Sequence, residues 1–115
     1  MTRDDIFVDN TRPAGDFSGV FEFEDETGYF YLYQIEGDEG AKIIGAIHVI
    51  TGTPDFKKDE VAVRWDTAEN KVGLFIRGRL WAAFDAVTKA KHGGNYHSTE
   101  QPTIPLEIAR SFDLQ

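Results

Sequence analysis

The sequence predicts a mainly β fold: a single antiparallel sheet of about six strands, strongly curved or forming an open barrel, with a short C-terminal helix. An α+β class is left open. Between residues 19 and 85 the chain is a succession of short β-type runs without a long helical pattern. Residues 29–33 are five consecutive large apolar or aromatic side chains, and residues 71–85 have the pattern of a complete hairpin.

The first third of the chain predicts one hairpin. Residues 6–8 are either a short strand or an apolar plug, and residues 19–24 alternate with Phe21 and Phe23 on one face. We expect a turn over residues 25–28, with Gly28 at positive φ. The next strand places its tyrosines on one face and its other large side chains on the opposite face, so we expect it at the centre of the sheet. The two sets are Tyr29, Tyr31 and Tyr33, and Phe30 and Leu32.

The middle third predicts a long strand, a loop and a short strand, over residues 42–50, 51–59 and 61–65. The acidic, glycine-rich residues 36–40 precede them as a loop. Regular alternation divides the long strand into two faces. These faces are Ile43, Gly45, Ile47 and Val49, and Ile44, Ala46, His48 and Ile50.

A turn at residues 66–70 leads to a hairpin with Arg77-Gly78 as its two-residue loop. This register pairs Ile76 with Arg79 and Leu74 with Trp81. The two predicted faces are Phe75, Leu80, Ala82 and Phe84, and Val72, Leu74, Ile76, Trp81 and Ala83. Residues 105–112 predict a short helix that begins at a proline. This helix is too small to cover a whole sheet face, so we expect the sheet to curl over itself.

Composition bounds the class of protein. The chain has 115 residues and no cysteine, which predicts one domain over residues 1–115 without disulfides or thiolate metal sites. The apolar run after the first residues is too short for a signal peptide, and no run approaches the length of a membrane helix. We therefore expect a soluble, cytoplasmic protein.

Charge indicates what the protein binds. Twelve basic and twenty acidic residues give a formal net charge of −8. Nucleic acids and anionic membranes are poor partners for such a surface, because their binding depends on contacts with phosphate groups. The charge fits a basic protein partner, and it also fits solubility alone. The sequence also leaves a homodimer open.

The sequence contains no motif that identifies a catalytic, cofactor or metal site. The histidines lack the spacing of zinc motifs, and the acidic segments 22–26 and 36–39 lack that of an EF-hand. The sequence therefore predicts no metal, no cofactor and no catalytic residue.

Two binding hypotheses remain. Tyr29, Tyr31 and Tyr33 form either a partner-binding face or part of the core, since tyrosine is common in both. Alternatively, a ligand pocket is formed near four residues: His48, Trp65, Trp81 and Asp85. We expect His48 to be at least half buried, because its strand face carries apolar neighbours.

Six short segments follow one another along the chain: residues 7–10, 26–31, 46–49, 63–65, 74–78 and 83–85. Together they resemble a bacterial family, domain of unknown function 2251. Their order and spacing cover about two thirds of the chain. The resemblance implies a small bacterial cytoplasmic protein and no catalytic residues.

The leading hypothesis for function is a non-enzymatic module that binds a protein partner. The alternative is a small-ligand-binding protein or minor enzyme with the pocket named above.

Overall fold

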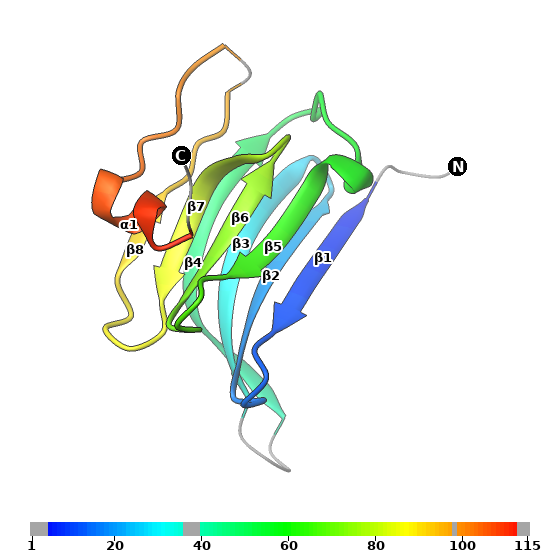
Figure 1. Cartoon of the computed structure of the whole chain (residues 1–115). Coiled ribbons are helices and arrows are strands. Elements are labelled where there is room, and N and C mark those ends of the chain that lie inside the picture. Colours follow the sequence, from blue (N-terminus) through cyan, green and yellow to red (C-terminus); the bar gives the residue numbers. More distant parts are fainter. Residues whose placement is uncertain (1–4, 36–39, 98, 113–115) are drawn as a thin grey trace.

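The computed structural model describes residues 5–35, 40–97 and 99–112 of the chain. Within these residues, eight strands form two four-stranded antiparallel sheets that pack face to face (Figure 1). The strands of each sheet follow chain order, so each is hydrogen-bonded to its neighbours in sequence. The mainly β class, the antiparallel pairing and the short C-terminal helix are confirmed.

Sheet A precedes sheet B in the chain. Sheet A contains β1 (Ile6–Thr11), β2 (Phe17–Glu24), β3 (Thr27–Ile35) and β4 (Ala41–Thr51). A 3-10 helix, η2 (Lys58–Glu60), leads into sheet B, which contains β5 (Val61–Trp65), β6 (Lys71–Ile76), β7 (Arg79–Asp85) and β8 (Lys91–Gly93). Helix α1 (Leu106–Arg110) lies near the C-terminus.

The prediction of a single curved sheet or open barrel of about six strands is wrong. After β4 the chain leaves sheet A through a loop that contains Gly52 and Pro54, and it begins a second sheet at β5. Proline has no N–H and cannot continue a central ladder, which suits a break at this point. Each sheet covers the apolar face of the other, so neither has to curl over itself.

The main core lies between the sheets. Its most buried large side chains come from both sheets, and the rings of Phe30 and Phe84 meet across the interface at 5.3 Å between centroids. These fully buried residues include Phe21, Phe30 and Leu32 from sheet A, and Leu74, Ile76 and Phe84 from sheet B. β3 lies between β2 and β4, as its two apolar faces predicted.

Hydrogen bonds join the two sheets at both edges. At one edge the Asn10 side chain donates to the Val63 carbonyl, and the Trp65 indole donates to the Asn10 carbonyl, each over 2.9 Å. At the other edge the chain after β8 crosses to β4, where the N–H of Asn95 donates to the carbonyl of His48. The sandwich is therefore cross-linked at both sides.

The β2–β3 turn differs from the expected one. Asp25 and Glu26 have φ of 54° and 64°, the values of a two-residue type I′ turn. Gly28 lies in β3 instead, opposite Phe23, and its φ is not positive. A Cβ at Gly28 would lie 2.9 Å from Cγ2 of Ile50, so glycine is required there for close packing rather than for the turn.

Two irregularities in β4 correct its predicted faces. The pairing with β3 shifts between Gly28 and Tyr29 and again between Leu32 and Tyr33. Each β-bulge places two β4 residues opposite one step of β3 and changes which face the following residues occupy. Ile50 is therefore in the core with Val49, while Ile43 is 50% exposed.

The β6–β7 hairpin has the predicted turn, but its register departs from the prediction after the Phe75–Leu80 pair. Arg77 and Gly78 have φ of 54° and 80°, and Ile76 pairs with Arg79. A bulge then follows, so Leu74 pairs with Ala82 and not with Trp81. The bulge moves Ala82 and Phe84 to the core face and Ala83 to the outer face.

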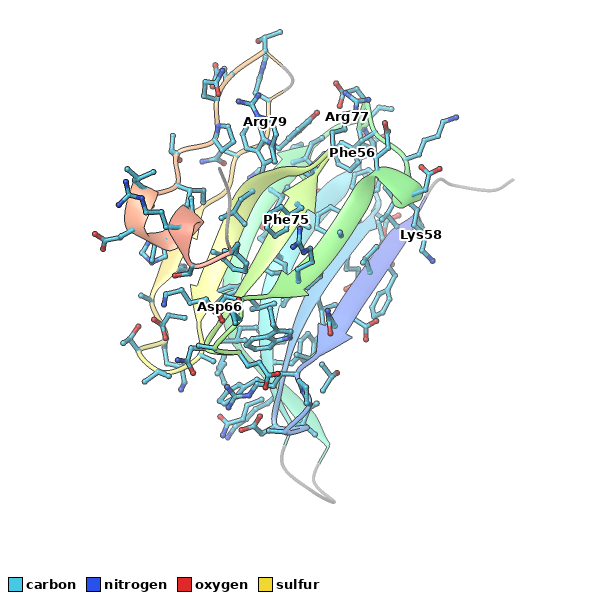
Figure 2. The ribbon with its side chains drawn as sticks, viewed as in Figure 1. Phe56, Lys58, Asp66, Phe75, Arg77 and Arg79 are labelled. Atoms are coloured by element: carbon cyan, nitrogen blue, oxygen red, sulfur yellow. The ribbon has the colours of Figure 1, made fainter. Side chains whose placement is uncertain are left out.

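Helix α1 packs on part of the outer face of sheet B, beside β7 and β8 in Figure 1. Ile108 and Phe112 pack there against Phe75, Leu80 and Ala83, and the rings of Phe75 and Phe112 lie 5.5 Å apart. Figure 2 shows Phe75 on this outer side of β6. This second cluster places the helix on one sheet only.

Candidate functional site

The outer face of sheet A carries the tyrosines. Residues of β1, β2, β3 and β4 pair side by side there in three rows, which we call the tyrosine face. The rows are Phe7, Glu22, Tyr29 and His48; Asp9, Val20, Tyr31 and Ala46; and Thr11, Ser18, Tyr33 and Ile43. The three tyrosines are partly exposed and belong to neither core cluster. Among the described residues, no helix packs on this face.

The aromatic rings form a continuous ladder along β3. The rings of Tyr29 and Tyr31 stack at 5.8 Å with 16° between their planes. Tyr33 meets Tyr31 edge-on at 6.0 Å, and the His48 ring meets Tyr29 edge-on at 5.4 Å. These contacts lie within the geometry that aromatic pairs prefer, so the rings hold one another in place.

The ladder covers an apolar patch of its own. Val20 is only 6% exposed although it lies outside both core clusters, and it pairs directly with Tyr31. Phe7 and Ile43, at opposite ends of the rows, are 52% and 50% exposed. The tyrosine face therefore combines buried apolar surface under the ladder with exposed apolar side chains on β1 and β4.

Acidic residues border the ladder and give it a negative potential. A side-chain hydrogen bond to Glu22 raises the pKa of Glu24, and the charges of Glu22, Asp25 and Asp5 raise it further. Burial raises the pKa of the Tyr31 hydroxyl, and the charge of Glu22 adds to that rise. Both shifts have neighbouring carboxylates among their causes, so negative charge acts on this face.

His48 is at least half buried, as predicted. Its Nε2 lies 2.7 Å from Oγ1 of Thr51, and its Nδ1 lies 3.3 Å from Oδ1 of Asn95. Its ring also contacts Tyr29. The imidazole is thus fixed at the margin of the tyrosine face by two polar neighbours and one ring.

The structure does not bring the four predicted pocket residues together. Trp81 is 3% exposed and lies in the main core. Trp65 lies on β5, an edge strand of sheet B, and its indole donates to the Asn10 carbonyl. Asp85 ends β7, where its carboxylate accepts hydrogen bonds from the N–H groups of Val87 and Thr88. Of the four, His48 alone is on the tyrosine face.

A groove of about 910 Å³ opens at the end of the sandwich, between β1, the β2–β3 turn and the loop before η2. Ile6, Phe23 and Phe56 form its apolar part, and Glu26, Lys57 and Lys58 are among its charged residues. Figure 2 shows Phe56 and Lys58 at this end. None of the four predicted pocket residues lines the groove.

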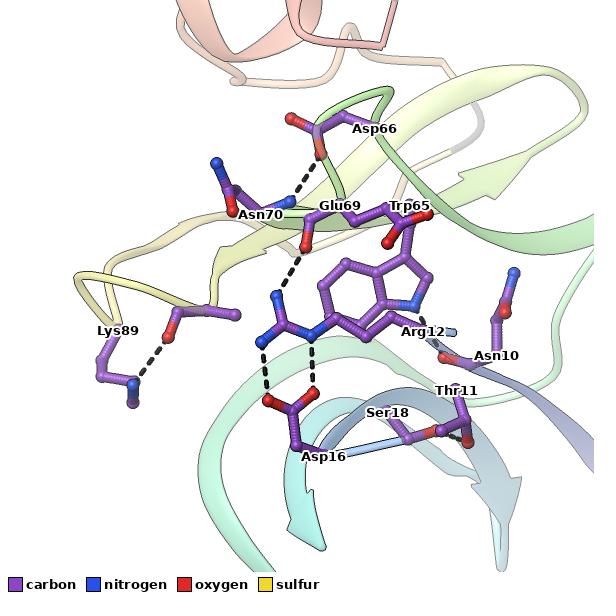
Figure 3. Close-up of polar contacts among 11 residues, drawn as sticks. Asn10, Thr11, Arg12, Asp16, Ser18, Trp65, Asp66, Glu69, Asn70 and Lys89 are labelled. Atoms are coloured by element: carbon purple, nitrogen blue, oxygen red, sulfur yellow. Dashed lines mark hydrogen bonds and ion pairs between the residues drawn. The ribbon is translucent and has the colours of Figure 1, made fainter. Parts of the chain in front are cut away.

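A cluster around Arg12 was not predicted from the sequence. Its guanidinium donates to both carboxylate oxygens of Asp16, over 2.7 and 2.8 Å, and to the carbonyl of Glu69 over 2.7 Å (Figure 3). The same group lies 4.9 Å from the ring of Phe17 and 5.6 Å from that of Trp65. The spacing of Arg12 and Asp16 around a Pro-Ala-Gly turn was the signal available in the sequence.

The described residues contain no group of three or more His, Asp or Glu side chains that could hold a metal ion. The acidic segment 22–26 lies within them, and the segment 36–39 lies outside them. No helix of the described part is long and apolar enough to span a membrane.

A family model described as an uncharacterised protein conserved in bacteria, DUF2251, matches residues 2–105. The chain belongs to this family. The DUF2251 match runs beyond Asp85, where the six resembling segments end, and includes β8 and the crossing to β4. No curated protein and no solved structure matches the chain.

Proposed function

We propose that this DUF2251 protein is a non-enzymatic interaction module that binds a protein partner through the tyrosine face. One observation carries the proposal: Tyr29, Tyr31 and Tyr33 lie on a sheet face that no described helix covers, whereas α1 packs on the outer face of sheet B. Tyrosine is enriched at binding hot spots because its ring gives a large contact area with few rotatable bonds.

The shape of the face supports a protein rather than a small molecule as the ligand. Its residues come from four adjacent strands, and the exposed Phe7 and Ile43 stand on β1 and β4. Small-molecule sites are concave and enclose most of their ligand. A broad side-chain surface of partly exposed rings suits a partner with its own surface.

The test begins with affinity capture of a partner from the source bacterium, followed by binding measurements with the purified pair. We expect Tyr31→Ser to weaken binding by about tenfold or more, because removing a hot-spot ring costs at least about 1–2 kcal/mol. The matched control is Leu106→Ser on α1, where Leu106 is 64% exposed on the other side of the molecule. We expect that variant to bind as the wild type does.

Circular dichroism and thermal unfolding of both variants separate binding from folding. A purified partner that binds equally well to folded variants of all three tyrosines would refute the proposed function. Equal loss in Leu106→Ser and Tyr31→Ser would also contradict it.

A further inference from the structure

The tyrosine face combines aromatic rings with carboxylates of one sign. Glu22 pairs directly with Tyr29, and Asp9 shares a row with Tyr31. Glu24 follows Glu22 by two residues, so it lies on the same face of β2. The twelve paired residues of the three rows include no lysine and no arginine.

The carboxylates are not neutralised within the described part of the chain. No ion pair there includes Glu22 or Glu24. A side-chain hydrogen bond with Glu22, followed by the negative charge of Glu22, raises the pKa of Glu24, as expected for two carboxyl groups side by side. A cation placed beside them would favour their charged forms, whereas an anion would disfavour them.

The chain holds one of its own arginines by the same combination of groups. Arg12 forms a bidentate pair with Asp16 beside Trp65 (Figure 3). Its guanidinium also lies near the ring of Phe17. A planar guanidinium can satisfy a carboxylate through its edge and an aromatic ring through its face. Glu22 and the ladder present both kinds of group to solvent.

We infer that the partner presents an arginine, whose guanidinium binds between Glu22 and the rings of Tyr29 and Tyr31. This inference rests on the proposed function and names the chemistry of the partner. Lysine is a poorer fit because its ammonium is a strongly hydrated point charge without a flat face. A second copy of the chain is also a poorer fit, since it would present the same carboxylates and a net charge of −8.

The probe is a short Gly/Ser peptide that carries two arginines, compared with the same peptide carrying two lysines. Binding is followed by two-dimensional ¹H–¹⁵N NMR of the full chain. We expect the arginine peptide to shift signals of residues 20–24, 29–33 and 46–48, and the lysine peptide to bind about threefold to tenfold more weakly.

Matched variants test the proposed contact. Glu22→Gln should weaken binding of the arginine peptide by about threefold to tenfold. Glu107→Gln removes one negative charge from exposed Glu107 on α1 and should change binding by less than about twofold. Tyr31→Ser should weaken binding, whereas Tyr31→Phe should retain it, because the ring and not the hydroxyl stacks on the guanidinium.

Equal binding of the arginine and lysine peptides would overturn the inference, as would equal losses in Glu22→Gln and Glu107→Gln. Either result would indicate attraction by net charge alone. The proposed function fails separately, when a reconstituted partner is insensitive to the tyrosines. If the partner needs Tyr31 but the chain binds the arginine and lysine peptides equally, the proposed function stands and the inference of a partner arginine is refuted.

Discussion

The hydroxyl of Tyr96 donates a hydrogen bond to Oδ1 of Asp55 over 2.7 Å. This contact joins the segment after β8 to the loop that links the two sheets. The Tyr96 ring also packs edge-on against Trp81 at 4.7 Å and against Phe56 at 5.1 Å. The Tyr96 side chain thus packs against Asp55 and Phe56, two residues that line the groove.

Tyr96 should titrate later than an ordinary tyrosine. Burial, followed by the bond to Asp55, raises its pKa from 10.0 to about 12. The folded chain therefore holds this proton more tightly than the unfolded chain does. The protonated Tyr96 hydroxyl therefore stabilises the fold fully below pH 10, and this stabilisation is lost as the pH rises toward 12.

Ultraviolet titration of tyrosinate in the wild type and in Tyr96→Phe checks this. The variant should lack the latest-titrating tyrosine and should lose about 1 kcal/mol of stability at neutral pH, the usual value of one hydrogen bond. A wild type whose four tyrosines all titrate near pH 10 would contradict the structure.

Trp81→Ala should cost about 3–5 kcal/mol of unfolding free energy, because it removes a large aromatic side chain from the core. Trp81 is 3% exposed and packs against Tyr96. Chemical denaturation measures the loss. Trp65→Phe is the comparison: it removes the N–H that donates to Asn10 while keeping a ring, and should cost about 1 kcal/mol. A loss below about 1 kcal/mol for Trp81→Ala would show that the core assignment is wrong.

The Arg12–Asp16 pair should make the free energy of unfolding depend on pH in the acidic range. The hydrogen bond from Arg12 lowers the pKa of Asp16 below its ordinary value of 3.8. The unfolded chain therefore binds this proton more readily, so the stabilisation is present above pH 3.8 and is lost as the pH falls through the folded pKa.

Asp16→Asn should lower stability at pH 7 by about 0.5–1 kcal/mol, as expected for an exposed ion pair of good geometry. The same variant should show a smaller difference from the wild type at pH 2–3. Urea unfolding at both pH values gives the comparison, with Glu107→Gln as the control for loss of a surface charge. A difference that stays constant with pH would argue against the pair.

Gly78→Ala should destabilise the β6–β7 hairpin by about 1 kcal/mol. Gly78 has φ of 80°, and a Cβ there would meet no atom within 4 Å, so the cost is one of backbone conformation alone. Gly78→Asn should cost less, because asparagine tolerates the left-handed region better than alanine. Thermal unfolding of the two variants tests the ranking, and equal Tm values would contradict it.

Local patterns predicted the local elements well. Alternation along β3 separated Tyr29, Tyr31 and Tyr33 from Phe30 and Leu32, and the Arg77-Gly78 turn lies where expected. The bulges in β4 and at Trp81 could not be predicted, because runs that are apolar on both faces look the same with or without an extra residue. The separation into two sheets depends on long-range packing, which the alternation of residues along one strand does not report.

The site was less predictable than the fold. The sequence left the tyrosines as either core or surface, because it does not say on which sheet α1 packs. His48, Trp65, Trp81 and Asp85 were grouped by residue type, whereas the strands place them at different edges and depths. Arg12 was missed because its partners Asp16 and Glu69 belong to two turns that meet only in the folded sandwich.

The cross-links at the two sides of the sandwich have a consequence for aggregation. Open strand edges invite other chains to add a strand through their main-chain groups. Here the Val63 carbonyl of β5 is taken by a side chain of β1, and the His48 and Val49 carbonyls of β4 accept from the chain after β8. Strand addition at these positions would first have to break native bonds. In the interaction that we propose, the partner contacts side chains of the tyrosine face instead of these main-chain groups, so residue identity selects it.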